Sequence, residues 1–124
     1  QDGRVLIAGG SDERDGRGAY VSAEIYDPRT GKFTATGDMN AARYKLQGTS
    51  VLLKDGKVLF AGGSDKAEIF DPATNTFSYV HGSLGTNRFF ATATLLRNGH
   101  VLITGGYDDS NAASAHAWEY RSSS

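Results

Sequence analysis

The sequence contains no cysteine, only two prolines and no long apolar run. The absence of cysteine excludes disulfide bonds, thiolate metal ligands and cysteine nucleophiles. No apolar stretch approaches the roughly 18 residues that a membrane-spanning helix needs. The formal net charge of −1, with no run of one sign, gives no electrostatic basis for binding nucleic acid or an anionic membrane. We therefore expect neither nucleic acid nor a membrane as a partner.

Glycine, in contrast, is abundant, and much of it falls in a string that occurs three times. The three copies end in a double glycine and span residues 2–10, 55–63 and 98–106. A second string follows each copy: Ala-Glu-Ile-Tyr-Asp-Pro, then Ala-Glu-Ile-Phe-Asp-Pro, then the weaker Ala-Trp-Glu-Tyr-Arg. The double glycines lie 53 and 43 residues apart, a period typical of propeller blades. Each repeat is therefore expected to be one small sheet that stacks on its neighbours.

Each repeat predicts short antiparallel strands. Asp-Gly or Asn-Gly at a two-residue turn favours a hairpin between the first strand and the apolar strand that follows it. Strands are expected at 49–53, 58–61, 67–70 and 76–80 in the second repeat and at 92–96, 101–104 and 117–121 in the third. In the first repeat they are expected in the apolar part of the string at 2–10, at 20–26 and at 32–36. No apolar stripe of helical period is present, so we expect almost no helix. Leu59 and Leu102 occupy the same place in continuous apolar strands and are expected to be buried.

The order of hairpin, apolar strand, double glycine and Tyr/Phe-Asp-Pro strand resembles the Kelch repeat of Kelch-type β-propellers, including the galactose-oxidase-like bacterial group. The resemblance extends over essentially the whole chain. It implies an all-β fold of about two and a half four-stranded antiparallel blades, as in an open fragment of a larger ring. We expect one partial propeller domain over 1–124, with a partial blade at 1–42, a blade at 43–84 and a partial blade at 85–124.

The expected strands number three, four and three in the successive repeats, which leaves open blade edges at both ends. We therefore expect the chain to be a fragment of a longer protein, with self-association through these edges as the alternative. The residues do not define the compartment. By resemblance, an extracellular or cell-envelope location is favoured.

In Kelch propellers, the loops after the double glycine and the segments that lead into each first strand share the usual partner-binding face. By this resemblance, the loops at 11–18, 64–66 and 107–111 lie on that face together with the lead-in segments near 43–45 and 87–88. The candidate ligand-binding residues are Asp12, Asp15, Arg43, Lys45, Asp65, Arg88, Tyr107, Asp108 and Asp109. For any one of these charges, a solvated loop position is the simpler interpretation.

Counting back from the hairpin glycines aligns Lys45 with Arg88. Many Kelch repeats carry arginine there. Lysine cannot make the planar bidentate contact with a carboxylate that arginine makes, so anion recognition at the middle repeat is in doubt.

No constellation of reactive residues stands out. The acidic loops could offer oxygen ligands to calcium, but neither has EF-hand spacing, and turn formation is the simpler explanation. Asp27 and Asp71 end equivalent strands on separate blades, so we expect them to stabilise turns rather than to form a catalytic pair. We predict no catalytic residue, no metal site and no cofactor.

The aromatic residues fall into two groups. Phe33 and Phe77 occupy equivalent places, which predicts packing between blades. The residues that remain as candidates for ligand contact are Tyr44, Phe89, Tyr107 and Trp118. Trp118 stands where the other repeats have Glu24 and Glu68.

We therefore expect a non-enzymatic Kelch-repeat module that presents loops to a protein or a glycan. One alternative is a non-catalytic part of a galactose-oxidase-like or other carbohydrate-active propeller enzyme. The copper–radical site of galactose-oxidase-like enzymes needs a cysteine crosslinked to tyrosine, which this chain lacks. The other alternative is a structural spacer in a large surface protein.

Overall fold

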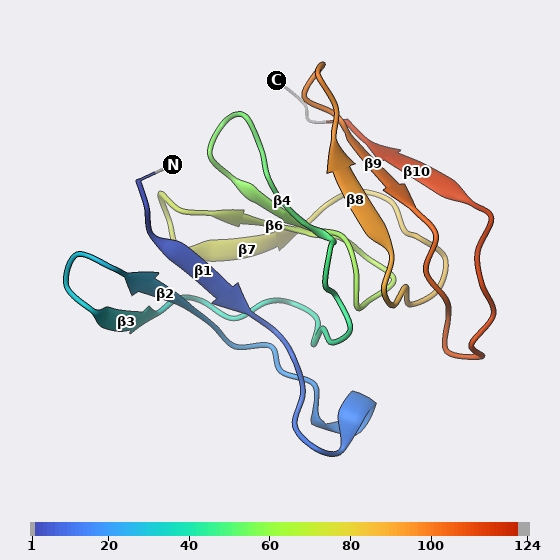
Figure 1. Ribbon diagram of the computed structural model, residues 1–124, viewed down its shortest axis with the longest axis horizontal. Helices are drawn as coiled ribbons and strands as arrows, with labels where there is room; N and C mark the ends of the chain where they lie inside the picture. The colour runs from blue at the N-terminus through green and yellow to red at the C-terminus, as the bar shows by residue number, and fades with distance from the viewer. Residues whose placement is uncertain (1, 122–124) are drawn as a thin grey trace.

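The structure, a computed structural model, describes residues 2–121, with the side chains of residues 15 and 16 also outside the description. Three antiparallel sheets follow one another along the chain (Figure 1). The first contains β1 (Val5–Ala8), β2 (Ala23–Asp27) and β3 (Lys32–Ala35). The second contains β4 (Ser50–Leu52), β5 (Val58–Phe60), β6 (Glu68–Asp71) and β7 (Thr76–Tyr79). The third contains β8 (Thr92–Leu95), β9 (Val101–Thr104) and β10 (Ala117–Tyr120).

The all-β prediction is confirmed, with three, four and three strands in open, blade-like sheets. Within residues 2–121 the only helical element is the single 3-10 turn η1 (Asp15–Gly18), and no helix there is long or apolar enough to span a membrane. The expected strand that begins at residue 20 starts instead at Ala23. The reason is that Tyr20 leaves the sheet and bridges to Arg43, whose N–H donates to the Tyr20 carbonyl at 3.2 Å.

The local turns follow the sequence. Gly56 and Gly99 have φ of +90° and +89° at the two hairpins, a conformation that glycine adopts at little cost. Asp27 and Asp71 accept hydrogen bonds through Oδ1 from the backbone N–H groups of Arg29 and Ala73, both at 2.9 Å. The expectation that these two aspartates stabilise turns is confirmed.

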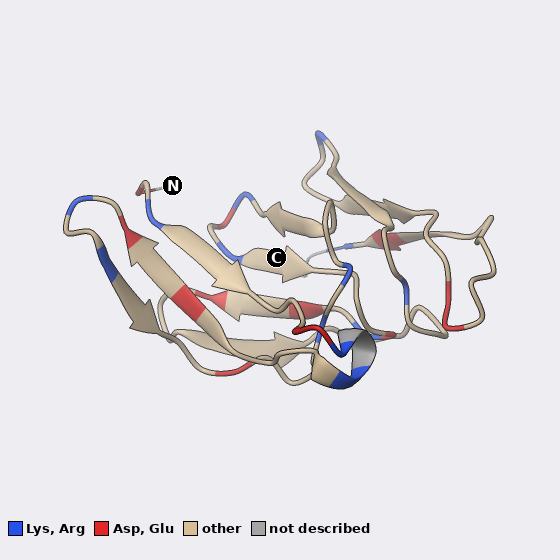
Figure 2. Cartoon of the chain, turned by 60° about the horizontal axis from the view of Figure 1, so that its bottom comes forward, with Lys and Arg blue, Asp and Glu red and all other residues tan. Residues whose placement is uncertain are grey.

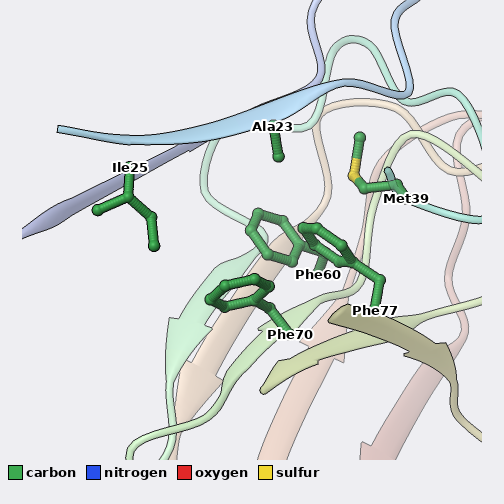
Figure 3. Packing of buried hydrophobic residues seen from close by; sticks show 6 residues of the cluster. All are labelled: Ala23, Ile25, Met39, Phe60, Phe70 and Phe77. Carbon is green, nitrogen blue, oxygen red and sulfur yellow. The ribbon is translucent and has the colours of Figure 1, made fainter. Parts of the chain in front are cut away.

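Two apolar cores hold the three sheets together. Ala23 and Ile25 point from the first sheet toward Phe60, Phe70 and Phe77 of the second (Figure 3). The rings of Phe70 and Phe77 lie 4.9 Å apart, and both side chains are buried.

The second core lies between the second and third sheets. Its buried residues are Val51, Leu53, Leu59, Ala61, Val101 and Ile103. Alternate residues of a strand point to opposite faces, so each sheet presents one set of side chains to each neighbour.

This alternation corrects two predictions. Leu59 is fully buried as expected, but its equivalent Leu102 is 37% exposed, because it points away from the second sheet and lies outside the second core. Phe77 is buried, whereas Phe33 is 58% exposed on the outer face of the first sheet. Phe33 instead pairs with its cross-strand neighbour Tyr26, with ring centroids 4.8 Å apart.

The double glycines fix how each repeat meets the next. Gly63 has φ of +76°, and a Cβ on it would lie 2.8 Å from the carbonyl oxygen of Tyr44. Its N–H donates to the carbonyl of Arg88 at 2.7 Å. Positive φ and the close approach of a neighbouring backbone both require glycine at this residue.

Candidate binding face

The loops after the double glycines lie beside the segments that lead into the first strands. Gly10 N–H donates to the Arg43 carbonyl at 2.8 Å, as Gly63 does to that of Arg88. Phe89 and Tyr107 exchange backbone hydrogen bonds of 2.9 and 3.1 Å. We call this surface the glycine face and define it as loops 11–18, 64–66 and 107–111 with lead-in segments 43–45 and 87–90.

Arg43 is fully buried beneath this face. Its Nε and Nη2 donate to Glu68 Oε2 at 3.1 and 2.9 Å, and its Nη1 donates to the Gly62 carbonyl at 2.9 Å. Burial lowers the pKa of Arg43, while the hydrogen bond and charge of Glu68 act in the opposite direction. The expectation that Arg43 is an exposed charge on the face is therefore wrong, because the guanidinium is used to fasten the lead-in segment to the second sheet.

Glu68 completes this buried network. Its Oε1 accepts from the Asn40 N–H at 2.6 Å, and its Oε2 accepts from the Ala41 N–H at 3.1 Å. A buried carboxylate requires such partners, since an unpaired charge in the interior is strongly unfavourable. The sequence offered one signal for this pair: a glutamate at the same place in two repeats, on an otherwise apolar strand.

The structure also corrects the alignment of the lead-in segments. Arg43, not Lys45, is the equivalent of Arg88, because both carbonyls accept from the second glycine of the preceding repeat. Lys45 instead corresponds to Phe90, and the two share positive φ values of 53° and 54°. Counting from the hairpin glycine failed because the segment from Arg43 to Val51 is two residues longer than the one from Arg88 to Thr94.

Arg88 lacks the partner that Arg43 has. Its side chain is 8% exposed, its Nε is buried, and no described residue accepts a hydrogen bond from that Nε. Trp118 takes the position of Glu68, opposite Ile103 on the neighbouring strand as Glu68 is opposite Phe60. The guanidinium carbon of Arg88 lies 5.1 Å from the centroid of the Trp118 ring. A cation–π contact thus stands where the middle repeat has an ion pair.

Aromatic rings gather on the glycine face between the second and third repeats. Tyr44 and Phe89 have ring centroids 4.9 Å apart, and Tyr107 lies 5.7 Å from Phe89. The Nζ of Lys45 lies 5.4 Å from the Tyr44 centroid and 5.9 Å from that of Tyr107. Phe89 is buried, but Phe90, 6.0 Å from Tyr107, is 49% exposed. The structure therefore brings together the predicted residues Lys45 and Tyr107 and adds the exposed ring of Phe90, which the sequence did not single out.

The acidic candidates mostly support their own loops. Asp12 pairs with Arg14 at 2.7 Å, and this hydrogen bond lowers the pKa of Asp12. Asp108 Oδ1 accepts from the N–H groups of Ala112 and Ser110, which hold its pKa below the ordinary value. Asp109 accepts from Asn87 Nδ2 at 3.2 Å, which ties the third loop to its lead-in segment.

The remaining acidic candidates add little chemistry. Asp65 is partly buried and accepts from Ser64 Oγ at 3.3 Å. The side chain of Asp15 lies outside the described residues. Acidic and basic residues are interspersed over the loops, and both signs occur around η1 (Figure 2). Over the described part of the chain, no group of three or more histidine, aspartate and glutamate side chains is arranged to hold a metal ion.

A family model, the Kelch motif, matches residues 1–40. The segment that holds the first sheet is therefore a Kelch motif. The other two sheets of the chain share with the matched segment an apolar strand that ends in a double glycine and pairs antiparallel with the strand that follows it. Kelch repeats are generally non-catalytic binding modules, and the motif indicates a protein-interaction repeat. The comparison with curated proteins found no match to the chain.

Proposed function

We propose that this Kelch-repeat chain binds a protein partner through the aromatic part of its glycine face. The observation that carries the proposal is the half-exposed ring of Phe90 beside Tyr107 and Lys45. Aromatic side chains are enriched in the buried centres of protein interfaces. A large apolar ring that is exposed on a rigid scaffold is suited to act as an anchor that a partner buries.

The backbone at this site supports the same proposal. Phe90 has φ of +54°, a region that a bulky residue rarely occupies, and its N–H donates at 2.8 Å to the carbonyl of Lys45. A strained conformation of this kind is kept only where the surroundings impose it, and such sites are frequent at ligand-binding positions. Here it directs an apolar ring outward from the lead-in segment.

A protein ligand is favoured over a glycan by the arrangement of the rings. Phe90 and Tyr107 are tilted by 42° and Tyr44 and Phe89 by 51°, so they do not form one flat platform for the face of a sugar ring. Tilted rings enclose an apolar side chain better than a planar sugar face. The mixed charges of the surrounding loops suit the polar rim of a protein interface.

The test is a selection of binders from a displayed peptide library, followed by affinity measurements on two matched variants. Phe90→Asn removes the ring while keeping a residue that tolerates positive φ. Phe33→Ser removes the exposed ring on the outer face of the first sheet. We expect selected binders to lose about tenfold or more in affinity for Phe90→Asn and to be unaffected by Phe33→Ser. Binders whose affinity falls for Phe33→Ser but not for Phe90→Asn would refute the proposed face. If the peptide library yields no binder and a glycan array does, the ligand is a glycan and the proposed protein ligand is wrong.

A further inference from the structure

The third loop of the glycine face, residues 107–111, belongs to the connection between β9 and β10, which extends well beyond the ends of these two strands (Figure 1). The loop carries Tyr107, whose ring lies 6.0 Å from that of the exposed Phe90. Connecting loops are in general the more mobile parts of a protein, because few buried contacts hold them. The contacts that hold this loop therefore decide where the Tyr107 ring stands when no ligand is bound.

Hydrogen bonds within the loop set its shape. The Asp108 N–H donates to the Ala112 carbonyl at 3.2 Å, and Asp108 Oδ1 accepts from the N–H groups of Ser110 and Ala112 at 2.9 and 3.1 Å. These bonds join residues that are close in the sequence, so they close the loop on itself. They do not fix its position against the lead-in segment 87–90.

Two contacts place the loop against that segment. Tyr107 and Phe89 exchange backbone hydrogen bonds of 3.1 and 2.9 Å. Further along the loop, Asn87 Nδ2 donates to Oδ1 and Oδ2 of Asp109, both at 3.2 Å. A second attachment prevents the loop from tilting about the first, and a hydrogen bond to a charged carboxylate is stronger than one between neutral groups. The pair of Asn87 and Asp109 therefore fixes the orientation of the loop.

The residues of this arrangement do not recur in the other repeats. Tyr107 follows its double glycine where the other two repeats have serine, and Phe90 aligns with Lys45. Asn87 aligns with Ala42, which has no side-chain donor. Residues that a repeat fold requires recur from one repeat to the next. The fold of a blade therefore does not explain why the two rings and the amide occur together, whereas a binding site at this place would.

We propose that Asn87 and Asp109 are positioning residues of the binding site, and that their hydrogen-bonded pair holds Tyr107 beside Phe90 before a ligand arrives. This inference rests on the function proposed above. A site that is already formed in the free chain spares the ligand the cost of ordering the loop, so the pair raises the affinity without touching the ligand. When the pair is broken, only a fraction of the molecules has the loop in place, and the apparent affinity falls by that fraction.

The test exchanges the two side chains. Asn87→Asp places two carboxylates together and breaks the pair, whereas Asn87→Asp combined with Asp109→Asn restores it with donor and acceptor reversed and the net charge unchanged. Asp109→Ala breaks the pair with the opposite change of charge, so a loss that both single variants share does not come from net charge.

The probe is the library peptide whose affinity falls most for Phe90→Asn. We expect each single variant to bind it about fivefold to tenfold more weakly, mainly through slower association, and the exchanged pair to recover the affinity to within about twofold. In the free chain, hydrogen–deuterium exchange of residues 107–111 should be faster in Asn87→Asp and return to the wild-type rate in the exchanged pair.

Three results would overturn the positioning role while leaving the proposed function in place. The first is an affinity that falls for Phe90→Asn but not for the two single variants. The second is a loss that the exchanged pair does not recover. The third is a loss confined to the dissociation rate, because it would mean that these side chains contact the ligand directly. If no selected peptide depends on Phe90, the proposed function fails and this inference fails with it.

Discussion

Arg43 Nη2 lies 2.9 Å from Glu68 Oε2, and neither side chain is exposed to solvent. The pair connects the segment that leaves the first sheet to the third strand of the second. It also explains why arginine and glutamate occur together in the middle repeat, since each would be an uncompensated buried charge without the other.

Removing one member of this pair should be strongly destabilising. We predict that Arg43→Met or Glu68→Gln each lowers the free energy of unfolding by about 3–5 kcal/mol, measured by denaturant titration. The double variant should cost clearly less than the sum of the two, because the residues share one interaction. Single-variant losses below about 1 kcal/mol would be typical of an exposed ion pair and would contradict the buried network.

Trp118→Glu should give Arg88 the carboxylate that Arg43 already has. We predict that this variant is more stable than Trp118→Gln by about 1–3 kcal/mol, since the two differ only in the charge offered to the guanidinium. The comparison is made by chemical denaturation followed by circular dichroism, because both variants lack the tryptophan. The difference in stability should disappear when both variants also carry Arg88→Met. A difference that persists would show that it does not arise from Arg88.

Leu59 and Leu102 are equivalent in sequence but not in burial. Leu59→Ala should lower the free energy of unfolding by about 2–5 kcal/mol, because it empties a fully buried site in the second core. Leu102→Ala should cost about 1 kcal/mol or less, since its side chain is 37% exposed. Equal costs in urea titrations would show that the outer face of the third sheet is covered in solution.

These two leucines show that the sequence predicts strands but not which face of a sheet is buried. The strands, hairpins and glycine positions could be predicted, because turn type and strand alternation depend on residues that are close in the sequence. Which face of a sheet is covered depends on what packs against it, and no local pattern contains that information. The repeat therefore predicted the same environment for Leu59 and Leu102, and for Phe33 and Phe77, where the structure gives different ones.

The sequence predicted which loops and segments form the candidate site, but it aligned the lead-in residues wrongly. The resemblance placed the double-glycine loops and the lead-in segments together, and the hydrogen bonds of Gly10 and Gly63 join them. The two extra residues before Val51 could not be located from residue types, so Lys45 was aligned with Arg88. The burial of Arg43 was not predicted either, because it depends on the tertiary pairing of Arg43 with Glu68.

Gly63 should tolerate no side chain. Gly63→Ala would combine a φ of +76° with a Cβ 2.8 Å from the Tyr44 carbonyl, a backbone atom that cannot easily move. Gly82→Ala is the matched control, because its φ is +95° but nothing lies within 4 Å of the new Cβ. Thermal and urea unfolding should place Gly63→Ala about 2 kcal/mol or more below Gly82→Ala. Similar stabilities would mean that the close approach at Gly63 relaxes without cost.

Asp108 should make the third loop sensitive to acid. Its carboxylate accepts from the Ala112 and Ser110 N–H groups, so its pKa in the folded state lies below the ordinary 3.8. A lowered pKa contributes stability that is fully present above pH 3.8 and is lost as the pH falls through the folded-state value. Asp108→Asn keeps an oxygen acceptor but removes this titration, so its stability should fall less steeply below about pH 4 than that of the wild type. Parallel acid profiles for the two proteins would contradict the assignment.

The central claim is that the aromatic part of the glycine face binds a protein ligand. Hydrogen–deuterium exchange of the chain with a selected peptide binder tests it most directly, because it reports every backbone segment in one experiment. Binding should slow exchange in segments 43–45, 87–90 and 107–111 and leave β1 to β3 unchanged. Protection confined to β1–β3, with no change around Phe90, would contradict the claim.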